Sequence, residues 1–436
     1  MVNEGRITVA DVLVRNGRIE KIAPRIGDGP AALEINGENK YLLPGAIDDQ
    51  VHFREPGLTH KATIGTEARA AVAGGVTSFM EMPNTIPNAL TQDLLEDKYA
   101  IAAQSSLANY SFFMGTGNDN ADEVLRTNDK KNDICGIKIF LGSSTGNMLV
   151  DNPQTLDRVF RESEVLIATH CEDERRVRAN YAELKARKPE LEPADHPIIR
   201  DAEACFESSL TAIQYAKKYG SRLHILHIST ARELQLFTNM IPLEDKRITA
   251  EACVHHLHFT ADDYARLGYR IKCNPAIKSA ENRDAIWEAL LDDRIDVIAT
   301  DHAPHLLSEK APPYEHAHAG LPLVQHSLSL MLYYQAQGKI TLEKIVEKMS
   351  HAVARMFAIK DRGYIREGYY ADLVVVDPTR PYTVTTDNLL YKCGWSPLEG
   401  MEMPASVTHT FVNGQLVYEN GQVLESGYGM RLKFDR

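Results

Sequence analysis

The chain has 436 residues, of which 44% are hydrophobic and 25% are charged, and its 48 basic and 60 acidic side chains give a net charge of −12. These proportions are typical of globular proteins and exclude wholesale disorder. No apolar run approaches the roughly 20 residues that span a bilayer, the first residues lack the pattern of a secretory signal, and the acidic balance disfavours nucleic acid as a partner. We expect a soluble cytoplasmic protein that binds neither membrane nor nucleic acid.

The six cysteines stand singly and form no Cys-x-x-Cys pair. Several fall inside apolar runs that are typical of strands. Isolated cysteines of this kind are usually buried and reduced in an intracellular protein. We therefore expect free thiols at Cys135, Cys171, Cys205, Cys253, Cys273 and Cys393.

Short apolar runs separated by turns fill residues 1–45 and return in residues 361–436. Asn-Gly between two apolar runs is the strongest short signal for a β-hairpin. It occurs at Asn16-Gly17 and again at Asn413-Gly414. The two β-rich ends predict one small β-sandwich domain to which both ends of the chain contribute.

The middle of the chain, residues 46–360, alternates strand-like and helix-like segments. A helix-like stretch that begins at Thr66 ends at Gly74-Gly75, a C-cap signal. Eight apolar runs alternate with such stretches, near 46–53 and at 76–82, 109–114, 134–140, 165–170, 222–227, 247–252 and 295–301. This order predicts an α/β fold, a (β/α)₈ barrel of the TIM type, as the catalytic domain.

Polar side chains stand at or near the ends of these predicted strands, where barrel enzymes carry their active sites. They are Gln50 and His52 on the first strand, Lys138 in the fourth, His170 after the fifth, His227 after the sixth and Asp301 after the eighth. Imidazole and carboxylate groups suit Zn²⁺, so the set predicts a binuclear metal site. His224 lies three residues before His227 and cannot share its strand face, so we expect it to pack in the core.

Six motifs resemble the amidohydrolase superfamily, and their order is most similar to dihydroorotases of the larger, pyrimidine-biosynthetic type. The similarity extends over nearly the whole chain. The motifs are Ile47-Asp-Asp-Gln-Val-His-Phe-Arg-Glu-Pro-Gly, Met82-Pro-Asn-Thr, Gly136-Ile-Lys-Ile-Phe, His170-Cys-Glu-Asp, His224-Ile-Leu-His-Ile-Ser-Thr and Ala299-Thr-Asp-His-Ala-Pro-His.

The resemblance implies reversible hydrolysis of L-dihydroorotate to N-carbamoyl-L-aspartate in de novo pyrimidine biosynthesis. By this resemblance, His52 would bind one zinc ion and His170 and His227 a second. Lys138 would carry a carbamate derived from CO₂ that bridges both ions, because a lysine among metal ligands makes sense only without its positive charge. Asp301 would bind the first ion and, as the catalytic residue, carry a proton from the metal-activated hydroxide to the leaving nitrogen.

Gln50 departs from the family pattern, which is His-x-His where this chain has Gln50-x-His52. An amide oxygen can reach a metal but is a weaker ligand for Zn²⁺ than imidazole. Three interpretations stay open. The first ion is bound more loosely, the site works with one ion, or the chain is a silent subunit that supports a partner such as aspartate transcarbamoylase.

The exocyclic carboxylate distinguishes dihydroorotate from hydantoin and allantoin. Arg54, two residues past His52, can pair bidentately with a carboxylate. The alternative, an allantoinase or hydantoinase, is disfavoured because a site for neutral rings would leave Arg54 unpaired. The resemblance adds further substrate-binding positions at Asn84 and His305 for the carboxylate, Asn274 for the ring and, more weakly, Gly320.

The resemblance also makes a homo-oligomer such as a dimer reasonable, with a small-molecule substrate as the principal partner. The segment 306–318 follows the last predicted strand and contains Pro312-Pro313. It is either a mobile cover for the site or a solvated loop, and no role is assigned to it from the sequence.

Overall fold

A computed structural model describes residues 1–27, 29, 31–142 and 148–436. At its centre, eight parallel strands of these residues form a barrel in chain order. Each strand overlaps the apolar run predicted for it, so the barrel prediction is confirmed. The strands are β6 (Ala46–Val51), β7 (Val76–Glu81), β8 with β9 (Asn109–Phe112, Met114–Gly115), β10 (Ile137–Phe140), β11 (Ile167–His170), β12 (Leu223–Ile225), β13 (Ile248–Cys253) and β14 (Val297–Ala299).

Two contacts join the strands into a closed ring. The end of β6 meets the segment after β14, where the His52 N–H donates to the carbonyl of His302 at 2.7 Å. β8 and β9 are one strand interrupted at Phe113, whose N–H donates to the carbonyl of Glu81. This strand pairs with β7 on one side and with β10 on the other. The ends of β6 and β14, which carry His52 and Asp301, are therefore neighbours.

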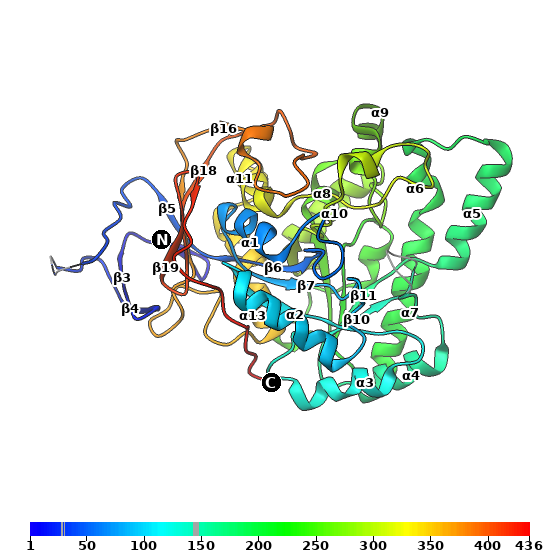
Figure 1. The fold of residues 1–436 in the computed structure, drawn as a ribbon, viewed down its shortest axis with the longest axis horizontal. Coiled ribbons are helices and arrows are strands. Elements are labelled where there is room, and N and C mark those ends of the chain that lie inside the picture. Colours follow the sequence, from blue (N-terminus) through cyan, green and yellow to red (C-terminus); the bar gives the residue numbers. More distant parts are fainter. Residues whose placement is uncertain (28, 30, 143–147) are drawn as a thin grey trace.

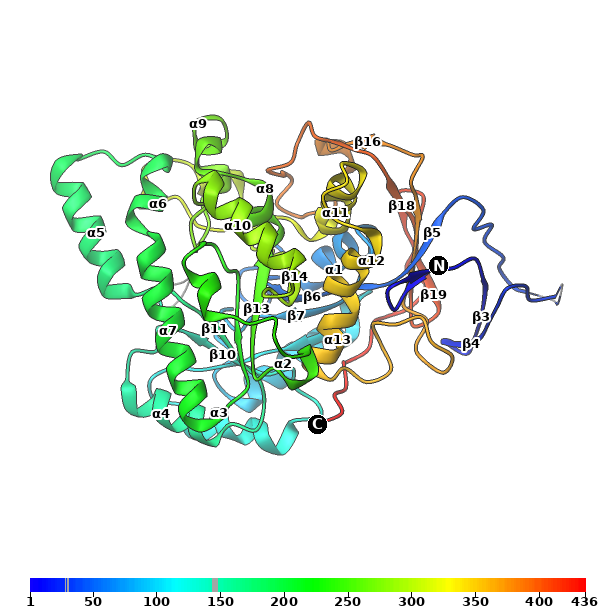
Figure 2. The same cartoon turned by 180° about the vertical axis from the view of Figure 1, so that it is seen from behind.

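Helices follow the strands and cover the barrel from outside (Figures 1 and 2). The predicted helix is confirmed as α1, which begins after Thr63, whose hydroxyl accepts the N–H of Thr66, and ends at Gly74. No helix in the described part of the chain is long and apolar enough to cross a membrane. The principal helices are α1 (Ile64–Ala73), α2 (Gln92–Ser105), α3 (Ala121–Leu125), α4 (Pro153–Glu162), α5 (Glu174–Arg187), α6 (His196–Ile199), α7 (Ala202–Tyr219), α8 (Val254–His258), α9 (Tyr264–Leu267), α10 (Ala280–Leu291), α11 (Ser327–Ala336), α12 (Leu342–Val346) and α13 (Ala352–Phe357).

Strands from both ends of the chain form a small β unit beside the barrel, where the blue and red segments of Figure 1 meet. β3 (Asp11–Arg15) and β4 (Arg18–Ala23) form a hairpin that packs against a five-stranded sheet. Ile19 of the hairpin and Leu373 of the sheet belong to the same apolar cluster. The two β-rich ends thus assemble with each other, as predicted. The antiparallel sheet has the order β20 (Gln422–Val423), β19 (Gln415–Glu419), β18 (Ser406–Val412), β15 (Leu373–Asp377) and β5 (Tyr41–Pro44).

Both predicted Asn-Gly hairpins are confirmed. Asn16 and Gly17 have φ of 52° and 78°, and Asn413 and Gly414 have φ of 52° and 75°, in the left-handed region that a type I′ turn needs. The two turns also touch each other, because a Cβ on Gly414 would lie 2.7 Å from the Cα of Gly17. Ala371 ties them together by accepting the Gly414 N–H and donating to the carbonyl of Gly17.

All six cysteines are free thiols, as expected. Five are buried, whereas Cys393 is partly exposed. Cys393 lies in the irregular segment between the short β16 (Tyr382–Thr383) and β17 (Glu402–Met403).

Candidate active site

One pocket lies at the C-terminal ends of the barrel strands and brings most of the predicted site residues together. Of the residues predicted for the site, all of which the structure describes, only His305 is absent from the pocket lining. The side chain of His305 is fully buried. Arg54, His227 and Asp301 have φ of 69°, 40° and 46°, a strained conformation that often occurs at functional sites. The lining is Gln50, His52, Arg54, Asn84, Lys138, Phe140, His170, His227, Asn274, Asp301, Ala303, Ala319 and Gly320.

His52 and Asp301 form the first pair of ligand-type side chains. His52 Nε2 lies 3.0 Å from Asp301 Oδ1, and His52 Nδ1 lies 2.7 Å from Asn84 Oδ1. An amide oxygen only accepts, so Asn84 keeps the ring proton on Nδ1 and leaves the Nε2 lone pair facing the carboxylate. Burial lowers the pKa of His52, which favours this neutral ring.

His170 and His227 form the second pair. His170 Nδ1 lies 3.0 Å from His227 Nε2, and His170 Nε2 lies 3.0 Å from Glu172 Oε2. The carboxylate accepts the Nε2 proton, so the Nδ1 lone pair faces His227. Burial acts to raise the pKa of Glu172, but the charge of Arg200 and the hydrogen bond from His170 lower it to about 2. Such carboxylate support is typical of metal-binding histidines.

Glu172 was missed from the sequence, although a signal was present. It lies two residues after His170, the spacing that places side chains on one face of a strand. Its partner Arg200 is 28 positions away, just after α6, and nothing local connects the two.

Lys138 is a buried lysine of β10 without a counter-ion. Its Nζ lies 4.6 Å from the centre of the Phe140 ring, and no hydrogen bond or ion pair to it occurs within the described residues. Burial lowers the pKa of Lys138 to about 8. The uncharged amine, the form that reacts with CO₂, is therefore more populated near neutral pH than in an ordinary lysine.

Gln50 contacts Asp301 through its amide nitrogen. Gln50 Nε2 donates to Asp301 Oδ1 at 3.3 Å, while its Oε1 lies 3.6 Å from Cys253 Sγ, whose thiol has a closer acceptor in Glu251 Oε1 at 3.2 Å. Burial holds the pKa of Cys253 well above its usual range, so the thiol keeps its proton. Gln50 thus acts as an orienting partner of the Asp301 carboxylate through its amide nitrogen.

Arg54 brings a positive charge into the same pocket. Its Nε donates to the carbonyl of Pro304 at 3.0 Å, and its Nη2 lies 3.0 Å from His305 Nε2. Burial lowers the pKa of Arg54 to about 10, which still leaves it charged at neutral pH. Within the described residues no carboxylate forms an ion pair with it. A buried arginine of this kind is suited to an anionic ligand.

Asn274 and Gly320 complete the pocket wall. Asn274 Oδ1 lies 3.1 Å from His196 Nε2, so its amide oxygen is occupied by the protein. Gly320 has a φ of 141°, and a Cβ there would lie 2.4 Å from the carbonyl oxygen of Ala303. Only glycine allows this segment of backbone to approach so closely.

The donor set fits a divalent metal ion. In each of the two pairs, two atoms of types that bind metals lie 3.0 Å apart. Burial lowers the pKa of His52, His170 and His227, so all three rings favour the neutral form that binds metals. Imidazole nitrogen with carboxylate oxygen is a usual ligand set for zinc.

Asp49, His224 and Glu251 form a second buried cluster between β6, β12 and β13. His224 Nε2 lies 3.3 Å from Asp49 Oδ2 and 3.7 Å from Glu251 Oε2. Burial opposes its charge, but hydrogen bonds and charges of these carboxylates raise the pKa of His224 to about 9. Glu251 Oε1 also accepts the backbone N–H of His227 at 2.9 Å. His224 is thus outside the pocket lining, as expected, but it is an ion-paired support rather than an apolar packing residue.

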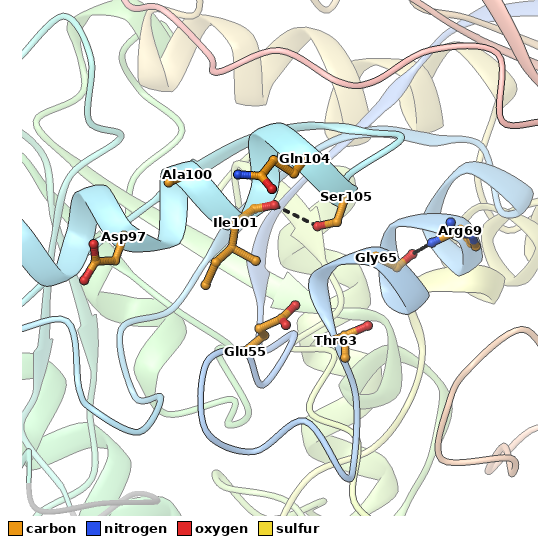
Figure 3. A pocket seen from close by; sticks show the side chains of 9 residues that line it. All are labelled: Glu55, Thr63, Gly65, Arg69, Asp97, Ala100, Ile101, Gln104 and Ser105. Carbon is orange, nitrogen blue, oxygen red and sulfur yellow. Dashed lines mark hydrogen bonds between the residues drawn. The ribbon is translucent and has the colours of Figure 1, made fainter.

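A second hollow lies on the outside of the barrel between α1 and α2 (Figure 3). Its polar groups are used locally, since Arg69 Nη1 donates to the carbonyl of Gly65 at 2.7 Å and Ser105 Oγ to that of Ile101 at 2.9 Å. None of the predicted site residues lines it. The pocket at the strand ends is therefore the candidate active site.

Comparison with known proteins agrees with this geometry. The amidohydrolase family matches residues 41–417. A dihydroorotase from Halobacterium salinarum is 32% identical over 418 residues, which cover 95% of this chain and 94% of the relative. An allantoinase from Desulfitobacterium hafniense is 29% identical over 433 residues, covering 97% and 95%. An L-hydantoinase (dihydropyrimidinase) structure from Arthrobacter aurescens superposes with a TM-score of 0.94 at 27% identity, covering 99% and 97%. The chain therefore belongs to the amidohydrolase family and is a hydrolase of the kind that acts on cyclic amides.

Proposed function

We propose that this amidohydrolase is a dihydroorotase, which interconverts L-dihydroorotate and N-carbamoyl-L-aspartate in pyrimidine biosynthesis. The observation that carries the proposal is Arg54, a charged and buried side chain in the pocket for which the described residues provide no carboxylate partner. The exocyclic carboxylate is the group that distinguishes dihydroorotate from neutral ring amides. Relatives named dihydroorotase support the same substrate.

Binding would place the substrate carboxylate at Arg54 and Asn84. Asn84 Oδ1 is occupied by His52 Nδ1, so the Nδ2 group remains to donate to the ligand. The ring would lie against Asn274 and the backbone at Gly320, both of which line the pocket. Two polar contacts with the carboxylate and one with the ring would orient the scissile amide toward His52, His170 and Asp301.

Zinc is the metal that we propose, as one or two ions. His52 and Asp301 would hold one ion, and His170 and His227 the other. Lys138 as a carbamate would contribute an anionic ligand in place of a repelling ammonium. When bound, zinc supplies Lewis acidity that polarises the ring carbonyl and lowers the pKa of water.

Asp301 is the residue that we propose moves the proton. Gln50 and His52 contact its Oδ1, whereas Oδ2 has no hydrogen bond in the part of the chain that the structure describes. Oδ2 is therefore the oxygen placed to take a proton from the attacking water and deliver it to the leaving ring nitrogen. In ring closure the same oxygen takes the proton from the attacking carbamoyl nitrogen, because the two directions share one path.

A hydrolase of neutral rings is the second candidate. The superposition on an L-hydantoinase and the similarity to an allantoinase favour it. Such a substrate would leave the charge of Arg54 buried without a counter-ion, which is costly. This cost favours dihydroorotate over hydantoin and allantoin.

The test is turnover by protein reconstituted with zinc, with the zinc per chain counted. We expect conversion of L-dihydroorotate and of N-carbamoyl-L-aspartate, and little conversion of dihydrouracil, hydantoin or allantoin. Preferential turnover of a neutral ring would assign the second candidate. Inactivity toward all of them would assign the silent-subunit interpretation that Gln50 left open.

A further inference from the structure

Lys61 is a buried lysine in the segment between β6 and α1, and it is 4% exposed. Its Nζ lies 2.9 Å from Glu309 Oε1 and 3.0 Å from His305 Nδ1. Glu309 belongs to the short helical turn Leu307–Lys310, within the segment 306–318 that follows the last barrel strand. Lys61 therefore links the chain after the first barrel strand to the chain after the eighth.

The contact between Lys61 and His305 favours one position of the His305 proton. An ammonium group has hydrogens to donate and no lone pair, and the Glu309 carboxylate at 2.9 Å favours the ammonium form. His305 Nδ1 must then accept, which leaves the ring proton on Nε2. A doubly protonated ring is disfavoured as well, because burial and the charges of Arg54 and Lys61 hold the pKa of His305 well below its ordinary value.

On its other side, the buried His305 ring contacts two residues of the pocket wall. Nε2 lies 3.0 Å from the carbonyl oxygen of Ala319 and 3.0 Å from Arg54 Nη2. With the proton on Nε2, the ring donates to the Ala319 carbonyl, and its contact with Arg54 brings together two N–H donors that cannot accept from each other. An anionic oxygen that accepts from both groups would relieve this contact. Arg54 and Ala319 line the pocket, and His305 lies directly behind them.

We propose that Lys61 is a positioning residue that holds His305 in the Nε2–H form, so that His305 and Arg54 present two converging donors to the carboxylate of the substrate. Glu309 keeps Lys61 in place for this purpose. The inference rests on the proposed function, because it supposes a ring that bears a carboxylate. It gives the segment 306–318 a part in substrate selection.

The first measurement is nitrogen NMR of zinc-loaded protein with isotope-labelled histidine, with His305 assigned by its loss in H305Q. We expect the Nδ1 of His305 to resonate as an unprotonated nitrogen and its Nε2 as a protonated one. K61M keeps the length of the side chain and removes its donors, so the protonation should change to a mixture or reverse. K61R retains donors toward His305 and should preserve the original form.

The second measurement compares two substrates. For L-dihydroorotate, K61M should raise KM roughly tenfold to a hundredfold, the size of one lost hydrogen bond to a charged group, and leave kcat nearly unchanged. Turnover of dihydrouracil, which has no carboxylate, should not fall. K348M is the matched control, because Lys348 is also a buried lysine that pairs with a carboxylate. Its Nζ lies 2.9 Å from Asp293 Oδ1, and Asp293 precedes β14, at the end of the barrel opposite to the pocket. K348M should leave both KM values unchanged.

Two results would overturn the proposal, namely an unchanged His305 spectrum in K61M or an equal loss of activity toward both substrates. If K61M does not fold, E309Q weakens the same contact and should shift KM in the same direction by a smaller factor. A wild-type enzyme that turns over no carboxylate-bearing ring would refute the proposed function. The NMR comparison would still decide whether Lys61 sets the protonation of His305.

Discussion

Arg54 carries its charge into a pocket where the described residues supply no carboxylate to balance it. R54M keeps much of the apolar stem and removes all donors. We expect kcat/KM for L-dihydroorotate to fall roughly a hundredfold or more, the scale of a lost charge-assisted pair. Turnover of dihydrouracil should be retained or increase. Steady-state kinetics with both rings checks this, and an equal loss for both would show that Arg54 serves the fold of the site instead.

Gln50 is the second residue whose side chain we expect to affect a measurable property, the retention of zinc. Its amide oxygen is turned to the Cys253 thiol and its nitrogen to Asp301. Q50H would replace this pair of contacts with an imidazole next to His52, and imidazole is a stronger zinc ligand than an amide. We expect Q50H to retain more zinc per chain than the wild type after dialysis against a chelator, measured by elemental analysis. Q50A serves as the control, and equal retention in Q50H and Q50A would argue against a metal position beside Gln50.

At the level of elements, the contact between the two Asn-Gly turns joins the first hairpin to the last sheet. Gly414 and Gly421 both have positive φ, but a Cβ at Gly421 meets nothing within 4 Å, whereas one at Gly414 meets the backbone of Gly17 at 2.7 Å. We expect G421A to cost about 1 kcal/mol of stability from φ alone and G414A roughly 2–4 kcal/mol because the backbones must also separate. Denaturant unfolding measures both, and equal costs would contradict the importance of the turn contact.

The cluster of Asp49, His224 and Glu251, which joins three barrel strands, makes the stability depend on pH. The pKa of His224 rises from 6.5 to about 9 in the folded chain, so its contribution is complete below pH 6.5 and is lost as pH rises through 9. The pKa of Glu251 is also raised, by burial and by the charge of Asp49, and this acts in the same direction.

We therefore expect the free energy of unfolding to fall by on the order of 3 kcal/mol between these two pH values. H224Q should be less stable below pH 9 and lose most of this slope. Urea unfolding at a series of pH values measures both effects. A stability that rises with pH in the wild type would contradict the ion-paired description of His224.

At the scale of the whole molecule, the sequence predicted the structural features that depend on short-range patterns. The barrel strands followed from eight β-branched runs, and the hairpins followed from Asn-Gly, because these signals lie within a few residues of each other. The residues of the pocket could be placed because parallel strands bring their C-terminal ends to one edge. Support from distant segments could not be predicted in this way. The contacts of Glu172 with Arg200, of Glu251 with the His227 backbone and of Lys61 with His305 join positions that only the folded barrel makes neighbours.

The pairing of β5 with β15 has a consequence for biosynthesis. β5 lies at the edge of the terminal sheet, and its partner β15 emerges from the ribosome more than three hundred residues later. At about 5–20 residues per second, the delay is on the order of 15–60 s. Throughout that interval the backbone groups of β5 have no strand to pair with, while the barrel strands that follow it can already associate with one another. β5 is thus synthesised before the barrel strands and is among the last strands to reach its final pairing.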